Sequence, residues 1–575
     1  MNYAASPVLA LRLPLWRSRL LLVLTAGGFL VLAGRAVYLQ GLNNDFLQQK
    51  GESRYSRVLE ISANRGRITD RHGEALAIST PVKSVWAIPE EAQYSSRERA
   101  RLAALLEMPA REIDRRLNES TAFVYLKRQI PPEVAERVSE LHLPGLFQNG
   151  EYRRYYPGGE VMAHLLGFTG ADDAGQEGIE LAFQSTLAGK SGSRRVIKDR
   201  LGQIVEDTES IREAQNGRDL ALALDAKLQN LAFRQLKLAV ESNKAKAGAI
   251  VVLDAKSGEV LALANLPTYN PNNRNHLSGS QLRNRVITDT FEPGSTLKPF
   301  TVALAIESGR ITPQSMIATA GGSLAIGKFT IHDAHHFGDM SVAQVIQRSS
   351  NVGAATIALG LPAEAMWGMF DKAGFGRAPR LGFPGEATGK LRAFRSWRPI
   401  EQATMAYGHG ISVSLLQLAR AYTIFARDGE LMPLSLLRLD APPAGRQIIS
   451  PDTARKLRAM LELAVEPGGT APRARVPGYR VAGKTGTAHK EEFGGYAAQK
   501  YVSSFVGLAP ASDPRLVIAV MLDEPSAGQY YGGAVAAPVF SAVMGGALRM
   551  LGVPPDAPLK PLELPPEGYE IKEGV

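Results

Sequence analysis

The sequence predicts an α+β fold, in which an antiparallel sheet carries helices on both faces. Alternating apolar runs separated by turn residues predict the sheet, and the residues Lys256-Ser257-Gly258 look like the turn of its first hairpin. Stretches with helical periodicity lie before and after the strands. The predicted strands are 220–224, 247–254, 258–263, 478–484, 502–509 and 516–522. The clearest predicted helices are 226–242 and 536–551.

The composition narrows the possible chemistry. The 575 residues are enough for two or three domains, and the chain has no cysteine. Disulfides, thiolate catalysis and cysteine-ligated metal sites are therefore excluded. The formal net charge of +10 indicates affinity for anionic surfaces. No stripe of basic and aromatic residues typical of nucleic-acid binding is present, so we expect no nucleic-acid partner.

The N-terminus is expected to be a membrane anchor. Residues 1–19 form a short tail that contains Arg12, Arg17 and Arg19. Residues 20–40 form a largely aliphatic run, long enough to cross a bilayer, in which Arg35 lies close enough to one end to snorkel. The arginines ahead of the run predict a cytoplasmic N-terminus, with the rest of the chain outside. A cleaved signal peptide is the alternative, but the run is long and no small-x-small site follows it.

Residues 41–218 are predicted to form a separate domain without a catalytic nucleophile. Within it, residues 90–118 have a helical composition, 178–187 suggest a short helix, and 193–207 alternate like a hairpin. Residues 219–552 are expected to form a compact domain that contains the sheet. Residues 553–575 form a proline-rich tail.

Ser295 and Lys298 are the first candidates for catalysis. Pro299 is tolerated only near the start of a helix, so we expect a helix that begins close to Ser295, with this serine as its N-cap. Three residues further on, the Lys298 amine falls on the same side as the Ser295 hydroxyl. A neutral amine there can take the hydroxyl proton and make the serine a nucleophile. Alone the pair is a weak signal, because a capped helix with a solvated lysine has the same pattern.

Two later motifs strengthen this interpretation. In Ser349-Ser350-Asn351, the hydroxyl of Ser349 can relay a proton to a leaving group, and the Asn351 amide can bind a substrate amide. This motif alone looks like an ordinary polar turn. In Lys484-Thr485-Gly486-Thr487, the strand period places both threonine hydroxyls on one face, and the glycine allows an extended substrate to approach. The charge of the lysine favours a carboxylate-ended substrate.

In this order the three motifs make the chain resemble the class B penicillin-binding proteins, specifically the division-specific D,D-transpeptidase type. The resemblance covers nearly the whole chain. Its further motifs are Arg65-Gly66, Arg154-Tyr155-Tyr156-Pro157, Gly178-Ile179-Glu180, Tyr269-Asn270-Pro271-Asn272-Asn273 and Tyr407-Gly408-His409-Gly410. It implies a transpeptidase domain of the serine β-lactamase-like fold at 219–552, behind an elongated, non-catalytic pedestal at 41–218.

The resemblance also implies residue roles. Ser295, Lys298 and Ser349 would be catalytic, and the backbone N–H groups of Ser295 and Thr487 would form the oxyanion hole. The implied substrate-binding residues are Asn351, Tyr407, Lys484, Thr485, Gly486, Thr487, Tyr501, Tyr530 and Tyr531. For the last three tyrosines, ordinary core packing is an equal alternative.

By this resemblance, Ser295 attacks the D-Ala-D-Ala end of a peptidoglycan stem peptide, releases D-alanine and passes the acyl group to an amine of a neighbouring stem. Penicillins would trap the same serine. The implied partners are stem peptides on lipid-linked nascent glycan, β-lactams, a SEDS-family glycosyltransferase and other division-complex membrane proteins. The implied location is the bacterial inner membrane, with the catalytic domain in the periplasm.

No metal or organic cofactor is implied; His332, Asp333, His335 and His336 suggest a zinc cluster, but the reaction needs no metal. Several alternatives remain open. The chain could be an elongation-specific or condition-specific auxiliary class B enzyme, a β-lactamase, a penicillin-sensing receptor, or a scaffold with a relic domain. The family also tends to have an aromatic residue where this chain has His409. Since histidine gains charge between pH 5 and 8, one hypothesis is that His409 makes acylation pH-dependent in this range.

Overall fold

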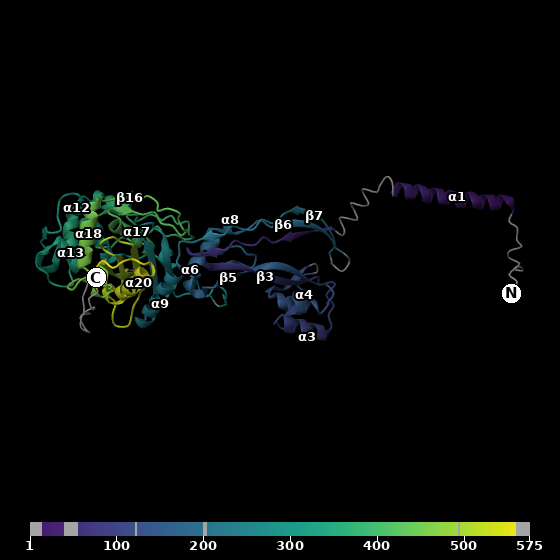
Figure 1. Ribbon diagram of the computed structural model, residues 1–575, viewed down its shortest axis with the longest axis horizontal. Coiled ribbons are helices and arrows are strands. Elements are labelled where there is room, and N and C mark those ends of the chain that lie inside the picture. The colour runs from purple at the N-terminus through teal and green to yellow at the C-terminus, as the bar shows by residue number, and fades with distance from the viewer. Residues whose placement is uncertain are drawn as a thin grey trace. The chain divides into compact units, whose positions relative to one another are not determined.

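The computed structural model describes residues 14–39, 56–120, 123–198, 204–275, 277–492 and 495–558, and its chain divides into two compact units (Figure 1). Residues 559–575 of the predicted tail lie outside the described residues. Unit 1 comprises Met1–Ala63, Val82–Glu151 and Lys190–Gln215. Unit 2 comprises Asn64–Pro81, Tyr152–Gly189 and Asn216–Val575. The chain therefore passes between the units several times before it reaches residue 216.

The predicted anchor is a helix, α1, at Leu15–Val37. It has 23 residues, and by length and composition it is the one helix of the described ranges that could cross a membrane. It begins before the predicted Leu20 because Arg17 and Arg19 both have good helix propensity, although they are charged.

In its described residues, unit 1 combines α1 and three further helices with short sheets. The predicted helix at 90–118 is two helices, α3 and α4, because Glu107 adopts a positive φ of 48° and Pro109 then precedes a new helix start. The predicted hairpin at 193–207 is formed by β6 and β7, which pair antiparallel, and β1 pairs with β6. Besides α1, the described elements of this unit are β1 (Ser56–Ile61), α3 (Ser96–Leu105), α4 (Ala110–Leu117), β4 (Val124–Ile130), α5 (Pro132–Ser139), β6 (Gly192–Lys198) and β7 (Ile204–Arg212). Two strands, β3 (Ala75–Ala87) and β5 (Leu146–Tyr155), have residues in both units.

Unit 2 is built on a five-stranded antiparallel sheet of order β10-β9-β19-β18-β17, which confirms the predicted α+β fold. Its strands are β9 (Ala247–Asp254), β10 (Val260–Leu266), β17 (Ala482–Glu492), β18 (Gly495–Ala509) and β19 (Leu516–Asp523). The prediction of 478–484 for β17 was wrong at both ends. Residues 476–479 form a tight turn, and pairing with β18 continues the strand to Glu492.

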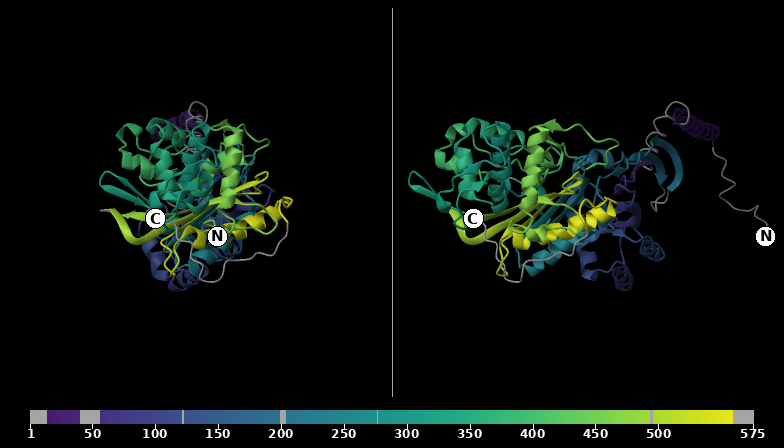
Figure 2. Two further views of the ribbon diagram at one scale, coloured as in Figure 1. Left: turned by 90° about the vertical axis from the view of Figure 1, so that its left-hand side faces the viewer. Right: turned by 60° about the vertical axis from the view of Figure 1, so that its left-hand side comes forward.

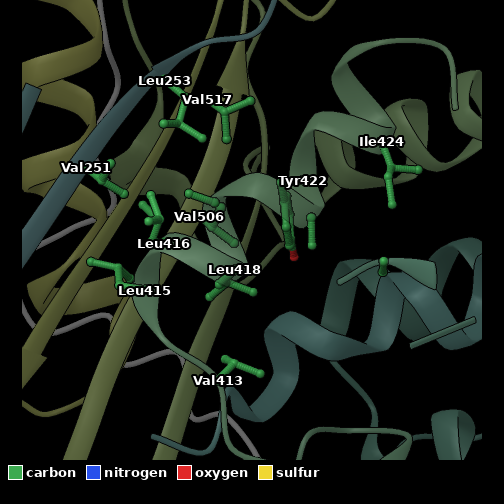
Figure 3. Packing of buried hydrophobic residues seen from close by; sticks show 14 of the residues in the cluster. Val251, Leu253, Val413, Leu415, Leu416, Leu418, Tyr422, Ile424, Val506 and Val517 are labelled. Carbon is green, nitrogen blue, oxygen red and sulfur yellow. The ribbon is translucent and has the colours of Figure 1, made fainter. Parts of the chain in front are cut away.

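Alternate residues of the central strands belong to two different cores. Ile250 and Val252 of β9 pack with α9 and α20, whereas Val251 and Leu253 pack on the side of α17 (Figure 3). Figure 2 shows the same layering, with the yellow α20 on one side of the sheet and the green helices on the other. This alternation is what an antiparallel sheet covered on both faces requires. The three helices are α9 (Ala226–Ser242), α17 (Leu415–Ala426) and α20 (Ala537–Met550).

The remaining elements of unit 2 are short strands and helices around this sheet. The strands are β2 (Ile68–Thr69), β8 (Leu220–Ala221), β11 (Met316–Ile317), β12 (Ser323–Ile326), β13 (Phe329–His332), β14 (Met340–Ser341), β15 (Glu430–Leu431) and β16 (Arg446–Gln447). The helices are α6 (Ala163–Leu166), α7 (Gly178–Ala182), α8 (Gln184–Leu187), α10 (Gly279–Leu282), α11 (Arg285–Thr288), α12 (Lys298–Glu307), α13 (Val342–Arg348), α14 (Asn351–Leu359), α15 (Ala363–Lys372), α16 (Pro399–Met405), α18 (Pro451–Leu463) and α19 (Gly532–Val535).

A buried carboxylate joins two of the early segments of unit 2. Glu180 accepts a hydrogen bond from the Arg65 Nε at 2.6 Å and from the Arg154 Nε at 2.7 Å, and all three side chains are almost fully buried. Arg65 also donates to the Gln184 side chain at 2.8 Å. Charges are buried in this way only when they are well paired, so each member depends on the others.

We predict that Glu180→Ala destabilises the protein by about 3–5 kcal/mol, because it leaves two guanidinium groups buried without their carboxylate. The measurement is the melting temperature of the detergent-solubilised chain. Arg67→Ala is the control, because Arg67 pairs with Asp219 at the surface, where an ion pair contributes less than about 1 kcal/mol. Equal melting temperatures for Glu180→Ala and the wild type would contradict the prediction.

Candidate active site

Ser295 lies in a short 3₁₀ turn, Gly294–Leu297, that leads directly into α12. The expectation that Ser295 caps the helix was wrong. The α-helix begins three residues later, at Lys298, where Pro299 is accommodated in the first turn without losing a hydrogen bond. The buried hydroxyl of Tyr422, on α17, donates to the Thr296 carbonyl at 2.8 Å and so holds the turn from the side of the sheet.

The amine of Lys298 is the centre of a hydrogen-bond network. Its Nζ lies 2.9 Å from the Ser295 Oγ, 3.0 Å from the Ser349 Oγ and 2.7 Å from the Asn351 Oδ1, and it also donates to the Ser349 carbonyl. The side chain is fully buried. A neutral amine has two hydrogens and one lone pair. If the two carbonyl oxygens take the hydrogens, the lone pair faces the two hydroxyls.

The second motif lies at the junction of two helices. Ser349 ends α13 in the left-handed conformation with a φ of 60°, and the Ser350 side chain caps α14 by accepting from the Gly353 N–H. Asn351 is therefore the first residue of α14. The Lys484 Nζ donates to the Ser349 Oγ at 2.9 Å. Ser349 thus connects the two lysines.

The glycine of the third motif allows a close approach within the protein itself. A Cβ on Gly486 would lie 2.7 Å from the Pro293 carbonyl oxygen and 3.0 Å from the Thr296 Cγ2. The missing side chain therefore lets the turn that carries Ser295 pack against β17. A Cβ on Gly294 would likewise lie 3.2 Å from the Thr487 carbonyl oxygen. This close approach brings the backbones of residues 294–295 and 487 together.

The two threonines of the third motif have different partners. The Thr485 hydroxyl lies 3.0 Å from the Thr470 hydroxyl and 3.3 Å from the Lys484 Nζ, and it is fully buried. The Thr487 hydroxyl accepts from the Gly532 N–H at 3.0 Å. Thr470 did not stand out in the sequence, because it lies in a loop outside the three motifs.

The aromatic candidates surround this centre. Tyr530 stacks on Tyr501 with ring centroids 4.0 Å apart and contacts Tyr531 at 4.4 Å, and all three rings remain partly exposed. They are therefore not part of the buried core. Gly532, which follows them, connects them to the Thr487 hydroxyl. Tyr407 is buried, and its ring centroid lies 6.0 Å from the Lys298 Nζ.

Asp333 is a supporting residue that sequence reasoning missed. Its carboxylate accepts from the Ser350 Oγ and the Asn351 N–H, both at 2.6 Å, and from the Val352 N–H at 3.0 Å. A carboxylate at a helix N-terminus is favourable, and here it fixes the residue that holds Lys298. The sequence grouped Asp333 with three histidines as a zinc cluster. Only the fold shows that it faces the start of α14.

Comparison with known protein families shows to which family the chain belongs. The penicillin binding protein transpeptidase domain matches residues 248–545, and the penicillin-binding protein dimerisation domain matches residues 60–222. The chain belongs to the penicillin-binding protein transpeptidase family. All three motifs lie within the first of these two domains.

Relatives of this penicillin-binding protein cover almost its whole length. The peptidoglycan D,D-transpeptidase FtsI of Escherichia coli K12 is 42% identical over 94% of this chain and 93% of its own. The probable peptidoglycan D,D-transpeptidase PenA of Neisseria gonorrhoeae is 42% identical over 92% of each chain. The apo structure of the TP domain of penicillin-binding protein 3 from Burkholderia pseudomallei is 50% identical and matches with a TM-score of 0.55. It covers 59% of this chain and 98% of that chain.

His409 of this penicillin-binding protein lies near the centre, in a largely buried environment that lowers the pKa of its ring. Its ring is 5.2 Å from the Tyr407 ring and 6.0 Å from that of Tyr496. Burial is the main cause that lowers the pKa of His409 to about 4, and the nearby groups of Lys298 and His489 lower it further. Burial therefore favours the neutral form of His409, which argues against a charge on this residue as the cause of a pH dependence between pH 5 and 8.

We predict that NMR of histidine-labelled protein shows a His409 midpoint near pH 4, with His409→Tyr identifying the signal. Because the folded pKa lies below the unfolded value of about 6.5, the stability contribution is complete above pH 6.5 and is lost as the pH falls toward 4. The melting temperature should fall less steeply over this range in His409→Tyr. A midpoint between pH 6 and 7 would contradict this result.

Proposed function

We propose that the protein is a peptidoglycan D,D-transpeptidase that works through an acyl-serine intermediate. The observation that carries the proposal is the position of the Lys298 amine, within 3.0 Å of the hydroxyls of both Ser295 and Ser349. The names of the relatives, which include FtsI and PenA, support the same reaction. No step of this mechanism requires a metal or organic cofactor.

In the first half-reaction, Ser295 Oγ attacks the carbonyl carbon of the penultimate D-alanine while neutral Lys298 accepts its proton. The backbone N–H groups of Ser295 and Thr487 are assigned to the developing oxyanion. Ser349, which lies between Lys298 and Lys484, passes a proton to the leaving nitrogen, and D-alanine departs. An ester then joins the stem peptide to Ser295.

In the second half-reaction, the amine of a neighbouring stem peptide attacks the ester. Lys298 and Ser349 remove its proton and return one to the Ser295 Oγ, which leaves a new amide cross-link and the free enzyme. Lys484 and Thr487 are assigned to the substrate carboxylate. Thr485 supports Lys484, because its hydroxyl accepts a hydrogen bond from the Lys484 Nζ and is itself hydrogen-bonded to the Thr470 hydroxyl. Asn351 and the stacked side chains of Tyr501, Tyr530 and Tyr531 are assigned to the border of the bound peptide.

The cellular assignment is part of the same proposal. We place α1 in the bacterial inner membrane, with the N-terminus in the cytoplasm and unit 2 in the periplasm, on the basis of the arginines before the apolar run. The resemblance to the division-specific type supports the proposal that the protein acts at the septum, together with a SEDS-family glycosyltransferase and other division proteins. An elongation-specific or auxiliary enzyme of the same chemistry is the second candidate.

We predict that penicillin acylates Ser295 at one molecule per chain and that Ser295→Ala abolishes the labelling, because the reacting hydroxyl is removed. Intact mass and peptide mapping measure both. Ser512→Ala, at an exposed serine, is the matched control and should label normally. Persistent labelling of Ser295→Ala would refute the assignment of the nucleophile.

A fluorescent protein fused to the N-terminus is predicted to gather at the division site and to stay with the full-length chain in the membrane fraction. The physical reason is that the apolar run acts as an uncleaved anchor. A uniform signal along the lateral wall would favour the elongation-specific enzyme. A soluble periplasmic protein that starts near residue 40 would refute the anchor.

A further inference from the structure

Glu292 lies three residues before Ser295 and holds the nucleophile turn to a neighbouring loop. Its Oε1 accepts from the Gly410 N–H at 2.7 Å. Next to this contact, the backbones of Phe291 and Val413 exchange two hydrogen bonds, at 3.0 and 2.9 Å. Residues 291–292, just ahead of the turn, and residues 410–413 are therefore bound to each other at two adjacent points.

The same carboxylate also reaches the end of the β17–β18 hairpin. The Tyr496 hydroxyl donates to Glu292 at 3.0 and 3.1 Å to its two oxygens. Tyr496 faces Glu491 across the hairpin and is 53% exposed, so packing alone does not fix its side chain. A cavity of about 250 Å³, lined in part by Glu292 and His489, lies beside this contact. Lys490, which lines the same cavity, ties the hairpin to Asp523 by an ion pair of 2.7 Å.

This carboxylate is held at an energetic cost. Burial raises the pKa of Glu292 and the charge of Glu491 raises it further, while the hydrogen bonds from Gly410 and Tyr496 oppose the shift. Within the described residues, the structure pairs Glu292 with no cationic side chain. A group whose folded pKa is raised in this way makes its ionised form unfavourable to folding. Stability alone therefore does not account for a glutamate at this position.

We propose that Glu292 is a positioning residue for acylation, which clasps the Ser295 turn to the 407–410 loop and, through the Tyr496 hydroxyl, to the hairpin that carries Lys484 and Thr487. The inference rests on the proposed function. The clasp fixes the distance between the nucleophile on one element and the oxyanion and carboxylate contacts on another. It does so from outside the reacting atoms, by hydrogen bonds rather than by packing.

The test is the kinetics of penicillin acylation by the full-length, detergent-solubilised protein, separated into the binding constant and the first-order acylation rate. Glu292→Gln keeps the shape but offers one carbonyl oxygen in place of two charged ones. If the hydrogen bonds to the charged Glu292 carboxylate position the nucleophile, weakening them in Glu292→Gln should lower the acylation rate by about 10-fold or more. We expect this loss in the first-order rate, with the binding constant within about two-fold of the wild-type value, since a misplaced nucleophile slows bond formation.

The melting temperature separates this role from a structural one. Because the charged form of Glu292 is unfavourable to folding, Glu292→Gln should melt at the same temperature as the wild type or higher. Glu307→Gln is the matched control, at the far end of α12, where the carboxylate accepts from the Ser450 N–H and hydroxyl. Burial raises the pKa of Glu307, but the hydrogen bonds from Thr453 and Ser450 lower it by more, so the net shift is downward. Glu307→Gln should therefore lower the melting temperature and leave the acylation rate unchanged.

A double-mutant cycle tests the link to the hairpin. Tyr496→Phe removes only the hydroxyl, and if the clasp acts as one unit, Glu292→Gln with Tyr496→Phe should be no slower than Glu292→Gln alone. Tyr479→Phe, which removes a hydroxyl bonded to the Val553 carbonyl, is the control and should acylate normally. Fully multiplicative rate losses would overturn the coupling. A raised binding constant with an unchanged first-order rate would show that Glu292 contacts substrate instead.

Failure of the inference is distinguishable from failure of the proposed function. If the function is correct, Glu292→Gln still reaches one penicillin per chain at Ser295, only more slowly. A wild-type rate in Glu292→Gln, with Ser295 labelled, would overturn the positioning role and leave the function intact. Absence of labelling in the wild-type protein would refute the function itself.

Discussion

The structure of the catalytic unit depends on one buried amine. The Lys298 Nζ contacts the turn of Ser295, the α13–α14 junction at Ser349 and the first residue of α14 at Asn351. A polar group in such a place is tolerated only when its hydrogen bonds are complete. The segments that supply the partners must therefore meet at this point, and Lys484 brings β17 to the same serine. The amine thus constrains the fold as well as the chemistry.

The layers on the two sides of the sheet have different tasks. On the side of α9 and α20, a large apolar core packs against the strands, and the buried Gln229 of α9 hydrogen-bonds the backbone of Leu263 on β10. On the side of α17, the same kind of core ends in a polar contact, the hydrogen bond from Tyr422 to Thr296. Through this hydrogen bond, the packing of α17 helps to fix the position of the turn that carries the nucleophile. The α17 core in Figure 3 therefore forms the base of the active-site turn.

The sequence predicted the fold class and the three motifs because both depend on local patterns. A short apolar run ahead of a turn predicted β9 to the residue, and the spacing of Ser295 and Lys298 placed their side chains together. What it missed depends on contacts between distant segments. The reason for glycine at 486 is the nearby Pro293 carbonyl, and the partner of Asp333 is a helix that starts 18 residues later. Likewise, burial rather than residue type sets the pKa of His409.

The interleaved path of the chain has a consequence for how the protein is made. Every segment of unit 1 lies before residue 216, whereas unit 2 combines Asn64–Pro81 and Tyr152–Gly189 with everything after Asn216. A ribosome therefore releases all of unit 1 while most of unit 2 is still unmade. The early segments of unit 2 emerge without the sheet on which they depend. During synthesis, the cluster of Arg65, Arg154 and Glu180 is a connection that these segments can form among themselves, long before the nucleophile exists.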